Sequence, residues 1–321
     1  MLIVSEETCK EVIGRSDAFE AVEAVFAAMA RGDAYNFPVI REAIGHVDAL
    51  YGFKGGFDRS GLTLGVKAGG YWPHNQKKNL INHQSTIFLF DPDTGQLHAL
   101  VGGNYLTAVR TAASSAISIA HLARRDAKVL GMVGAGHQAG FQLRSAAEQR
   151  DFEKVIAWNL HPDMLPGLGQ IAQEIGLPFE AVEREQLGAE ADVIISITSA
   201  HEPLMMKDWV KPGTHLACMG TDTEGKQEMD PALIASATLF SDEVEQSISI
   251  GETQHAISAG LIEKSDITPI GAVINKAHSG RVSADEITLF DGTGVGLQDL
   301  AVASTAARLA QEQDKAQTVD L

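Results

Sequence analysis

The segment from Ala127 to Gly140 constrains the fold of this 321-residue chain more than any other. An apolar run, Val-Leu-Gly-Met-Val, leads into Gly134-Ala-Gly-His-Gln-Ala-Gly, and apolar residues at helical spacing follow. This order is typical of a strand, a glycine turn and a helix, whose free N–H groups and positive end bind phosphate. The GxGxxA spacing is a weak signal alone, but the flanking strand and helix are the context that it requires. The segment therefore predicts a dinucleotide-binding turn.

Length and charge limit the possible classes of protein. The chain is long enough for two domains, because single hydrophobic cores stop growing at about 250–300 residues. A net charge of −17 argues against nucleic acid or an anionic membrane as a partner, although local arginines can still bind a small anion. Only two cysteines are present, so neither a disulfide framework nor a cysteine zinc site is expected.

The N-terminal residues and the apolar runs predict where the protein works. The first residues, Met-Leu-Ile-Val-Ser-Glu-Glu, lack a basic segment followed by a long apolar one, so no signal peptide is expected. No apolar run approaches the roughly 18 residues that a membrane span needs. We therefore expect a cytoplasmic protein with no nucleic-acid and no membrane partner.

The pattern before residue 128 predicts a mixed α+β domain. Apolar residues at helical spacing predict a helix over residues 16–31, and the following region has the alternation and turns of strands. Residues 86–90 and 96–101 are expected to form a hairpin around Asp91-Pro-Asp-Thr-Gly95. A helix rich in small residues is expected over 106–123.

The remainder of the chain alternates between strands and helices, which predicts an α/β fold with a parallel, doubly wound sheet of the Rossmann type. The expected strands are 128–133, 154–158, 192–198, 214–219, 238–241 and 288–290, and the expected helices are 138–149, 163–175 and 242–259. The expected domains are residues 1–122, with a final helix over 301–321 that packs back onto them, and residues 123–300.

Arg110 lies near the start of the predicted helix over 106–123, whose residues are mostly small and apolar. A permanent cation in or beside a core needs an anionic partner. One interpretation is a structural salt bridge. The other is a bidentate clamp on a substrate carboxylate, helped by the helix N-terminus.

Three other charged residues have a structural and a functional interpretation. Lys67 ends a predicted strand just before Ala68-Gly-Gly70 and is either a surface lysine or the cation of a closed pocket. Arg41 follows Pro38-Val-Ile40 and is either an exposed strand-end charge or an anion-binding group. Asp222 follows the predicted strand 214–219, where ligands of α/β sheets collect, or else it is a turn or cap residue.

Metal and serine-hydrolase chemistry are not expected. The chain has eleven histidines, but His74, His83 and His98 do not have helical ligand spacing, and no glutamate accompanies a histidine pair. No Gly-x-Ser-x-Gly elbow is present either. We therefore predict no metal site.

Five features, in this order, resemble the ornithine cyclodeaminase/mu-crystallin family over nearly the whole chain. They are Lys67, Arg110-Thr-Ala-Ala-Ser-Ser-Ala, Gly134-Ala-Gly-His-Gln-Ala, Gly220-Thr-Asp222 with Lys226-Gln-Glu228, and Gly294 followed by Gln298-Asp299-Leu. Together they are far more specific than any one of them. The resemblance implies a homodimer formed through the first domain, which thus serves in substrate binding and dimerisation.

The resemblance also implies roles for individual residues. Arg41, Lys67 and Arg110 would hold the substrate carboxylate, with Lys67 and Asp222 as catalytic residues and Thr293 facing the substrate. The cofactor would contact residues of the glycine turn and of the strand ends, namely Thr111, Gly134, Gly136, His137, Gln138, Asn159, Thr198, Ala217, Cys218, Met219, Gly220, Lys226 and Gly292.

Two features indicate a subgroup of this family. Crystallin-type members lack the aspartate that this chain keeps as Asp222, which favours an enzyme over a binding protein. The segment from Asn79 to Thr86, which includes His83, is more polar than its counterpart in cyclodeaminases. Extra polar groups, with His83 among the substrate-binding residues, would suit a second substrate carboxylate. The chain therefore most resembles the iminosuccinate reductases of the family.

The expected function is an NAD(H)-dependent imino acid reductase or L-amino acid dehydrogenase, with reduction of iminosuccinate to L-aspartate as the specific prediction. The alternatives are an ornithine cyclodeaminase that releases proline and ammonia, an alanine dehydrogenase, and a mu-crystallin-like, cofactor-dependent ligand binder. NAD is predicted rather than NADP, because Asn159-Leu-His161-Pro offers no arginine for a 2′-phosphate. No acidic residue stands there to reject one.

Overall fold

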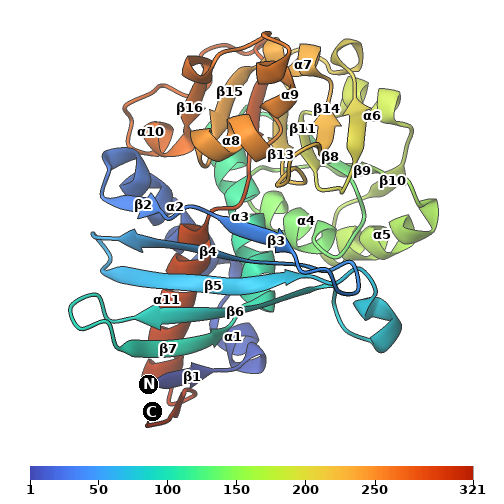
Figure 1. The fold of residues 1–321 in the computed structure, drawn as a ribbon. Coiled ribbons are helices and arrows are strands. Elements are labelled where there is room, and N and C mark those ends of the chain that lie inside the picture. The colour runs from blue at the N-terminus through green and yellow to red at the C-terminus, as the bar shows by residue number, and fades with distance from the viewer. Residues whose placement is uncertain (321) are drawn as a thin grey trace. The chain divides into compact units, whose positions relative to one another are not determined.

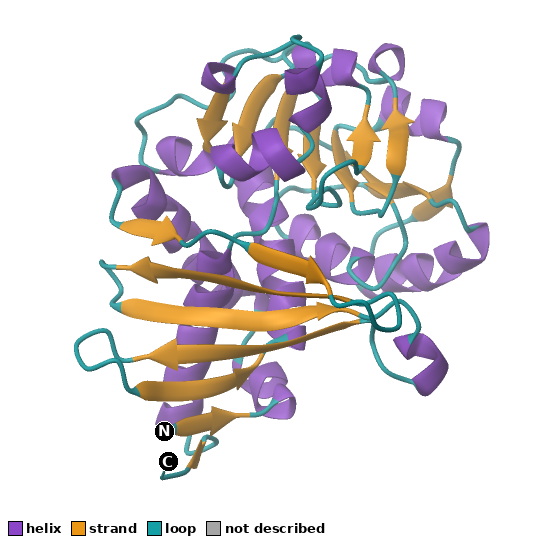
Figure 2. Cartoon of the chain, in the orientation of Figure 1, coloured by secondary structure: helices purple, strands orange, loops and turns teal. Residues whose placement is uncertain are grey.

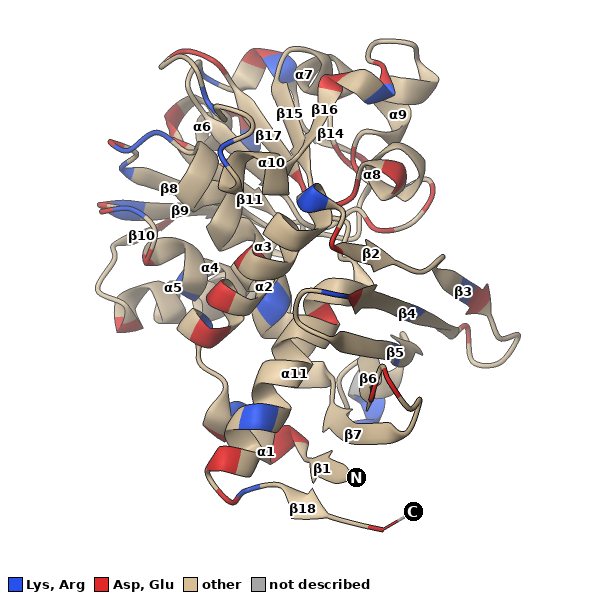
Figure 3. Cartoon of the chain, turned by 90° about the vertical axis from the view of Figure 1, so that its left-hand side faces the viewer, with Lys and Arg blue, Asp and Glu red and all other residues tan. Residues whose placement is uncertain are grey.

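The computed structural model describes residues 1–320, apart from the side chain of Gln76, and the chain forms two compact units. Unit 1 consists of Met1–Arg110 and Val295–Leu321, and unit 2 consists of Thr111–Gly294. Each unit combines a sheet with helices (Figures 1 and 2), and acidic and basic positions are interspersed along the elements (Figure 3). Every helix within residues 1–320 is too short or too polar to cross a membrane.

Unit 1 is built on an eight-stranded sheet with the order β18-β1-β7-β6-β5-β4-β2, in which β3 also pairs with β4. Its neighbouring strands are antiparallel, except that β1 and β7 are parallel. The strands are β1 Leu2–Val4, β2 Ala34–Asn36, β3 Ile40–Ala43, β4 Leu50–Asp58, β5 Thr63–Tyr71, β6 His83–Phe90, β7 Leu97–Gly102 and β18 Gln317–Thr318. The predicted hairpin is therefore β6–β7.

Helix α11 (Gly296–Glu312) lies against this sheet, as the red helix in Figure 1, and packs beside α2 (Arg15–Arg31). Two glycines of the sheet let it come close. A Cβ on Gly56 would lie 2.9 Å from Leu297 Cγ, and one on Gly65 would lie 2.8 Å from Leu300 Cδ2. The turn of α11 between these leucines carries two polar residues, and both are completely buried. Short α1 (Glu6–Val12) completes the helices of this unit that precede α3.

Unit 2 is a parallel sheet of eight strands with the order β10-β9-β8-β11-β13-β17-β15-β16. The strands are β8 Val129–Val133, β9 Lys154–Trp158, β10 Phe179–Ala181, β11 Val193–Ser196, β13 His215–Cys218, β15 Thr238–Ser241, β16 Ile267–Pro269 and β17 Thr288–Asp291. The chain moves from β8 to β9 and β10 on one side and continues with β11 on the other. This reversal is the switch point of a doubly wound fold, where dinucleotides bind.

The remaining elements of unit 2 connect the strands of the sheet. They are α4 Ala139–Ala147, α5 Leu165–Glu174, α6 Arg184–Glu190, α7 Pro231–Ala235, α8 Val244–Ile250, α9 Gln254–Ser258, α10 Ile270–Ile274, and a separate pair of strands, β12 His201–Met205 and β14 Gln227–Met229. The parallel, Rossmann-type sheet predicted from the sequence is confirmed.

Three features differ from those expected from the sequence. The final helix, expected over 301–321, is α11 over Gly296–Glu312, because Gln317–Thr318 pair with β1 as strand β18. The helix predicted over 242–259 is two helices, because extended backbone at Gly251 separates α8 from α9. The units meet at 110/111 and 294/295 rather than at 122/123 and 300/301. Helix α3 (Asn104–Leu122) is continuous across the first boundary, so no local break in the sequence marks it.

The close packing of α11 on the sheet makes Gly65 intolerant of a side chain. In Gly65→Ala the new Cβ would lie 2.5 Å from Phe88 O and 2.8 Å from Leu300 Cδ2, so the free energy of unfolding should fall by about 1–3 kcal/mol. The matched control is Gly167→Ala on α5, where nothing lies within 4 Å of the added Cβ. It should be neutral or stabilising by up to about 1 kcal/mol. Chemical denaturation checks both variants, and a Gly65→Ala protein as stable as the wild type would contradict the packing.

Candidate active site

A buried cluster of charged residues lies in unit 1, where three elements far apart in sequence meet. Lys67 of β5 and Arg110 of α3 both contact Asp299 of α11, with Lys67 Nζ 2.6 Å from Oδ2 and Arg110 Nε 3.0 Å from Oδ1. The exposed side-chain fractions are 7%, 8% and 0%. Arg110 Nη1 also donates to Gln298 Oε1 at 2.9 Å, and Lys67 Nζ lies 3.5 Å from Thr107 Oγ1. Two cations therefore contact one carboxylate in a dry environment.

Burial sets the protonation of this cluster. Burial lowers the pKa of Lys67 to about 7, helped by the charges of Arg110 and Lys54 and opposed by Asp299. Burial alone would raise the pKa of Asp299, but Arg110 and Lys67 outweigh it, so this pKa lies below its usual value. Burial and the neighbouring cations lower the pKa of His83 to about 3, so its imidazole is neutral near pH 7. Asp299 stays ionised, and Lys67 can exchange a proton near neutrality.

The structure answers one question about Arg110. Of the two interpretations, the buried ion pair is present, and its partner Asp299 was not assigned a role from the sequence. An acidic residue next to Gln298 in the first turn of an alanine-rich helix was the available signal. The carboxylate-binding role of Arg110 stays a prediction.

Arg41 and His83 lie on strands of the same sheet as Lys67. Arg41 is exposed on β3 and stands opposite Gly52 of β4. His83 begins β6 and stands opposite Tyr71 of β5. Lys54 of β4 stands directly opposite Lys67, so both side chains lie on one face of the sheet. This adds a basic residue to the face that the sequence did not single out.

The glycine turn of unit 2 has the geometry that a phosphate requires. Gly134 has a φ of +110°, and a Cβ there would lie 2.7 Å from Ile197 O. Gly136 is exposed, and a Cβ there would meet no atom within 4 Å. Asn159 fixes the turn from β9, because its Oδ1 accepts from Ala135 N at 3.0 Å and its Nδ2 donates to His161 O at 2.8 Å. The backbone of the turn is thus held open towards solvent.

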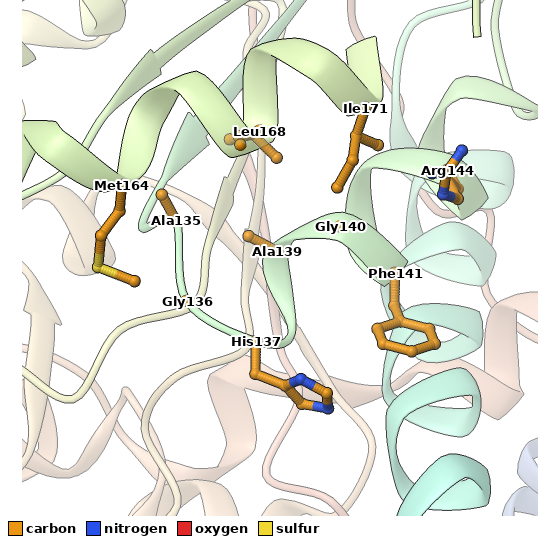
Figure 4. A pocket seen from close by; sticks show the side chains of 11 residues that line it. Ala135, Gly136, His137, Ala139, Gly140, Phe141, Arg144, Met164, Leu168 and Ile171 are labelled. Carbon is orange, nitrogen blue, oxygen red and sulfur yellow. The ribbon is translucent and has the colours of Figure 1, made fainter. Parts of the chain in front are cut away.

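A cavity of about 310 Å³ lies beside this turn, between the starts of α4 and α5 (Figure 4). Its lining residues are Ala135, Gly136, His137, Ala139, Gly140, Phe141, Arg144, Met164, Gly167, Leu168 and Ile171. The exposed His137 marks the tip of the turn, with its ring 5.6 Å from that of Phe141. Gln138 Oε1 is buried without a hydrogen-bond partner among the described residues. The turn and the cavity fit a dinucleotide phosphate.

Other predicted cofactor residues lie at or near the carboxyl ends of the strands. Thr198 follows β11 and Gly220 follows β13, and the backbone N of each donates a hydrogen bond to the buried side chain of Glu228. Ala217 and Cys218 are completely buried within β13, so their side chains serve the core of the sheet. Gly292 donates to Cys218 O at 2.9 Å, Met219 is nearly buried, and Thr111 is buried on α3. Their contacts with a cofactor stay predictions.

Thr293 is held by Asp242 in the turn after β17. The backbone N and the Oγ1 of Thr293 donate to Asp242 Oδ1 at 3.0 and 2.7 Å, and Gly294 N donates to Oδ2 at 2.8 Å. The hydroxyl hydrogen of Thr293 is therefore engaged, so the side chain can serve a ligand only as an acceptor.

Asp222 lies in the turn between β13 and β14, where it forms an ion pair with Lys226. The Nζ of Lys226 is 2.7 Å from Asp222 Oδ1 and 3.1 Å from Gly220 O. The side chain of Asp222 is 34% exposed and that of Lys226 is 20% exposed. The ion pair and the contact with Gly220 O close the turn. The geometry fits both a turn-stabilising and a proton-transferring aspartate.

Buried carboxyl groups lie behind these turns. Asp291 Oδ2 accepts from Ser247 Oγ at 2.6 Å and from Glu252 N at 2.9 Å. Burial, reinforced by the charge of Asp242, raises the pKa of Asp291 to about 8. Burial and the charge of Glu228 also raise the pKa of Glu252. Within residues 1–320, no group of three or more His, Cys, Asp or Glu residues has the arrangement of a metal site.

The chain belongs to the ornithine cyclodeaminase/mu-crystallin family, whose model matches residues 1–313. It is 64% identical to the iminosuccinate reductase of Paracoccus denitrificans, over 100% of both chains. The crystal structure of that enzyme in complex with NAD+ matches with a TM-score of 0.97, over 100% of this chain and 99% of that one.

Two further solved structures resemble the chain at lower identity. An archaeal alanine dehydrogenase dimer with bound NAD is 29% identical, with a TM-score of 0.95, over 100% of this chain and 99% of that one. The Delta(1)-pyrroline-2-carboxylate reductase of Thermococcus litoralis, in complex with NADH and L-proline, is 27% identical, with a TM-score of 0.93. That match covers 99% of this chain and 100% of the other. The predicted family and fold are confirmed.

The raised pKa of Asp291 predicts how stability depends on pH. Native Asp291 keeps its proton up to about pH 8, whereas the unfolded chain loses it near pH 4. Between these values the native state binds more protons than the unfolded state, so rising pH lowers the free energy of unfolding. Asp291→Asn cannot ionise. Its stability relative to the wild type should therefore rise by up to about 1.4 kcal/mol per pH unit between pH 5 and 8.

Denaturation of both proteins at pH 5, 6, 7 and 8 checks this expectation. The asparagine keeps an oxygen for Ser247 and for the amide of Glu252, so the variant should fold. A stability difference that stays constant with pH would show that Asp291 is ionised throughout.

Proposed function

We propose that this protein is an NAD(H)-dependent imine reductase that reduces iminosuccinate to L-aspartate. The observation that carries the proposal is the 64% identity to iminosuccinate reductase over 100% of both chains. Three similar solved structures contain NAD+, NAD or NADH, which confirms the prediction of NAD as the cofactor. They also confirm the predicted class, an oxidoreductase that acts on an amine or an imine.

In this proposal, the α-carboxylate of the substrate binds to Lys67 and Arg110. A guanidinium offers a planar pair of donors for a carboxylate, and Asp299 fixes the orientation of both cations before the substrate arrives. A substrate carboxylate would favour the protonated form of Lys67, whose pKa is about 7. The cations thereby bind the substrate and place its C=N carbon.

The second carboxylate of iminosuccinate is assigned to the polar groups of the same sheet. Arg41 supplies a charge, and the neutral imidazole of His83 can donate one hydrogen bond. Such a carboxylate would distinguish iminosuccinate from imines with an apolar side chain. These assignments follow the resemblance to iminosuccinate reductases.

The cofactor would be held by residues of unit 2. The phosphates would lie on the turn at Gly134 and Gly136 with His137 and Gln138, the adenosine ribose at Asn159, and the nicotinamide half at Thr198, Met219, Gly220, Lys226 and Gly292. When it is bound, NADH supplies the hydride that is added to the imine carbon.

Asp222 is proposed to manage the proton of the substrate. Reduction of an imine adds a hydride to carbon and leaves an amine, so the nitrogen must carry a proton when the hydride arrives. An ionised carboxylate favours the protonated imine, which accepts a hydride better than the neutral one. Lys226, with Nζ 2.7 Å from Asp222 Oδ1, holds that carboxylate in its turn.

A homodimer is part of this proposal, and the similar archaeal alanine dehydrogenase, which is a dimer, supports it. The family resemblance assigns the contact to unit 1. In unit 1 of this chain, large apolar residues are exposed on strands β2 to β5 and on the loops beside them, including Tyr35, Ile40, Phe53 and Tyr71. A self-association surface would cover such side chains. A cytoplasmic location stays a prediction.

The direct test follows NADH absorbance in mixtures of oxaloacetate and ammonia, which generate iminosuccinate. Consumption of NADH with formation of L-aspartate is expected, and pyruvate with ammonia should react far more slowly. Conversion of ornithine to proline without net NADH change would instead identify a cyclodeaminase. Binding of NADH without turnover of any of these compounds would identify a ligand binder.

Asp222→Asn tests the proton-transfer role in the same assay. The substitution keeps the shape but removes the base, so kcat should fall about 10²–10⁴-fold. The dissociation constant of NADH should change little, because the glycine turn supplies the phosphate contacts. If Asp222 only stabilises its turn, the folded variant keeps its kcat and loses about 0.5–2 kcal/mol of stability. An undiminished kcat in a stable variant would end the assignment.

A further inference from the structure

Glu228 of β14 is a buried carboxylate that joins the ends of two neighbouring strands. It is 1% exposed. Its Oε1 accepts from the backbone N and the Oγ1 of Thr198, both at 2.7 Å. Its Oε2 accepts from Ser196 Oγ at 2.7 Å and from Gly220 N at 3.1 Å. Both oxygens are thus occupied by donors at the ends of β11 and β13.

These two strands pair directly, with Ser196 opposite Cys218 in the last register position of β11 and β13. The chain leaves the sheet at Thr198 and at Gly220, so each residue begins a turn. A Cβ on Gly220 would lie 2.5 Å from Thr198 O and 2.6 Å from Glu228 Cδ. The two turns and the carboxylate are therefore packed without space for a side chain at residue 220.

Glu228 is itself held in place from behind. Glu252 Oε1 accepts from the backbone N of Glu228 at 2.9 Å and from that of Met229 at 2.6 Å. The other oxygen of Glu252 accepts from Thr221 Oγ1, in the turn after β13. The position of the Glu228 carboxylate is thus fixed by its own backbone as well as by its four donors.

Ligands of doubly wound sheets bind beyond the carboxyl ends of the strands, and the half of the sheet after the switch point receives the second nucleotide of a dinucleotide. In this chain that half begins with β11 and β13. We infer that Glu228 is a positioning residue, whose carboxylate holds the turns at Thr198 and Gly220 in the conformation that receives the nicotinamide half of NAD(H). The inference rests on the proposed function, since it requires that the protein binds this cofactor.

The chain offers a matched control in the same sheet, at the amino ends of its strands. Asp192 is 7% exposed and joins the amino ends of β8 and β11. Its Oδ2 accepts from Lys128 N at 2.7 Å and from Val129 N at 2.9 Å, and its Oδ1 contacts Arg124 and Lys211. Asp192 is also a buried carboxylate that joins two strands, but at their amino ends, where no cofactor is expected.

The experiment compares Glu228→Gln with Asp192→Asn and the wild type. The glutamine keeps the size of the side chain, but its NH₂ group replaces one of the two oxygens. That group cannot accept the two hydrogen bonds that the replaced oxygen accepts. We expect the dissociation constant of NADH, measured by fluorescence titration, to rise about 10–100-fold, because hydrogen bonds from the Glu228 side chain to the two cofactor turns are lost. In Asp192→Asn this constant should stay within about twofold of the wild type, while the Tm falls at least as much as in Glu228→Gln.

A folded Glu228→Gln protein that binds NADH as the wild type does would overturn the inference. So would an equal loss of NADH affinity in Asp192→Asn, since the effect would then follow stability alone. If Glu228→Gln does not fold, Glu228→Asp keeps the carboxyl group but is one methylene too short to reach both turns, and the same rise in the dissociation constant is expected. A wild-type protein that does not bind NADH would overturn the proposed function along with the inference.

Discussion

The ion pairs of the Asp299 carboxylate, which is completely buried on α11, are the interactions on which the proposed substrate-binding half of the site depends. A buried charge of this kind is strongly unfavourable unless paired, and here Lys67 and Arg110 approach it at 2.6 and 3.0 Å. The pairing joins α11, β5 and α3, so the fold of unit 1 and the position of its two cations have one cause. Glycines in β4 and β5 allow the close approach of α11 that makes the pairing possible.

In unit 2, the site for a large anionic cofactor is formed by backbone groups and not by cations. The turn after β8 presents N–H groups and an exposed Gly136, and Asn159 fixes its shape. Behind the second half of the sheet, carboxylates rather than cations order the turns, as Glu228 does for Thr198 and Gly220 and as Asp242 does for Thr293 and Gly294. Binding energy can then be spent on the reacting groups rather than on ordering loops.

Much of the fold could be predicted because its signals are local. The glycine turn, the hairpin of β6 and β7 and the alternation of strands and helices each occupy a short stretch of sequence. The break at Gly251 was missed, since one glycine in a helical pattern does not decide between a weak helix and a turn. The boundary within α3 was missed because the helical pattern continues through it.

The site was predicted less completely, for a different reason. Residue types and a family resemblance pointed to Lys67, Arg110 and Asp222, but not to the groups that hold them. Asp299 lies 189 positions from Arg110, and Glu228 lies 32 positions from Ser196. No periodicity or local motif reports such pairings, which arise only when the chain has folded. The buried acids also look like ordinary charged residues in a sequence, whereas burial is what gives them their role.

The account can be tested most directly through substrate binding to Asp299→Asn. Removal of this charge leaves Lys67 and Arg110 without the partner that orients them, whereas the glycine turn of unit 2 is unchanged. The KM for iminosuccinate should rise at least about 30-fold, the scale for truncating one partner of a buried charge pair. The dissociation constant of NADH, measured on the same sample, should stay within about twofold. A folded Asp299→Asn enzyme with wild-type KM would show that the buried ion pairs are structural and that the substrate carboxylate binds elsewhere.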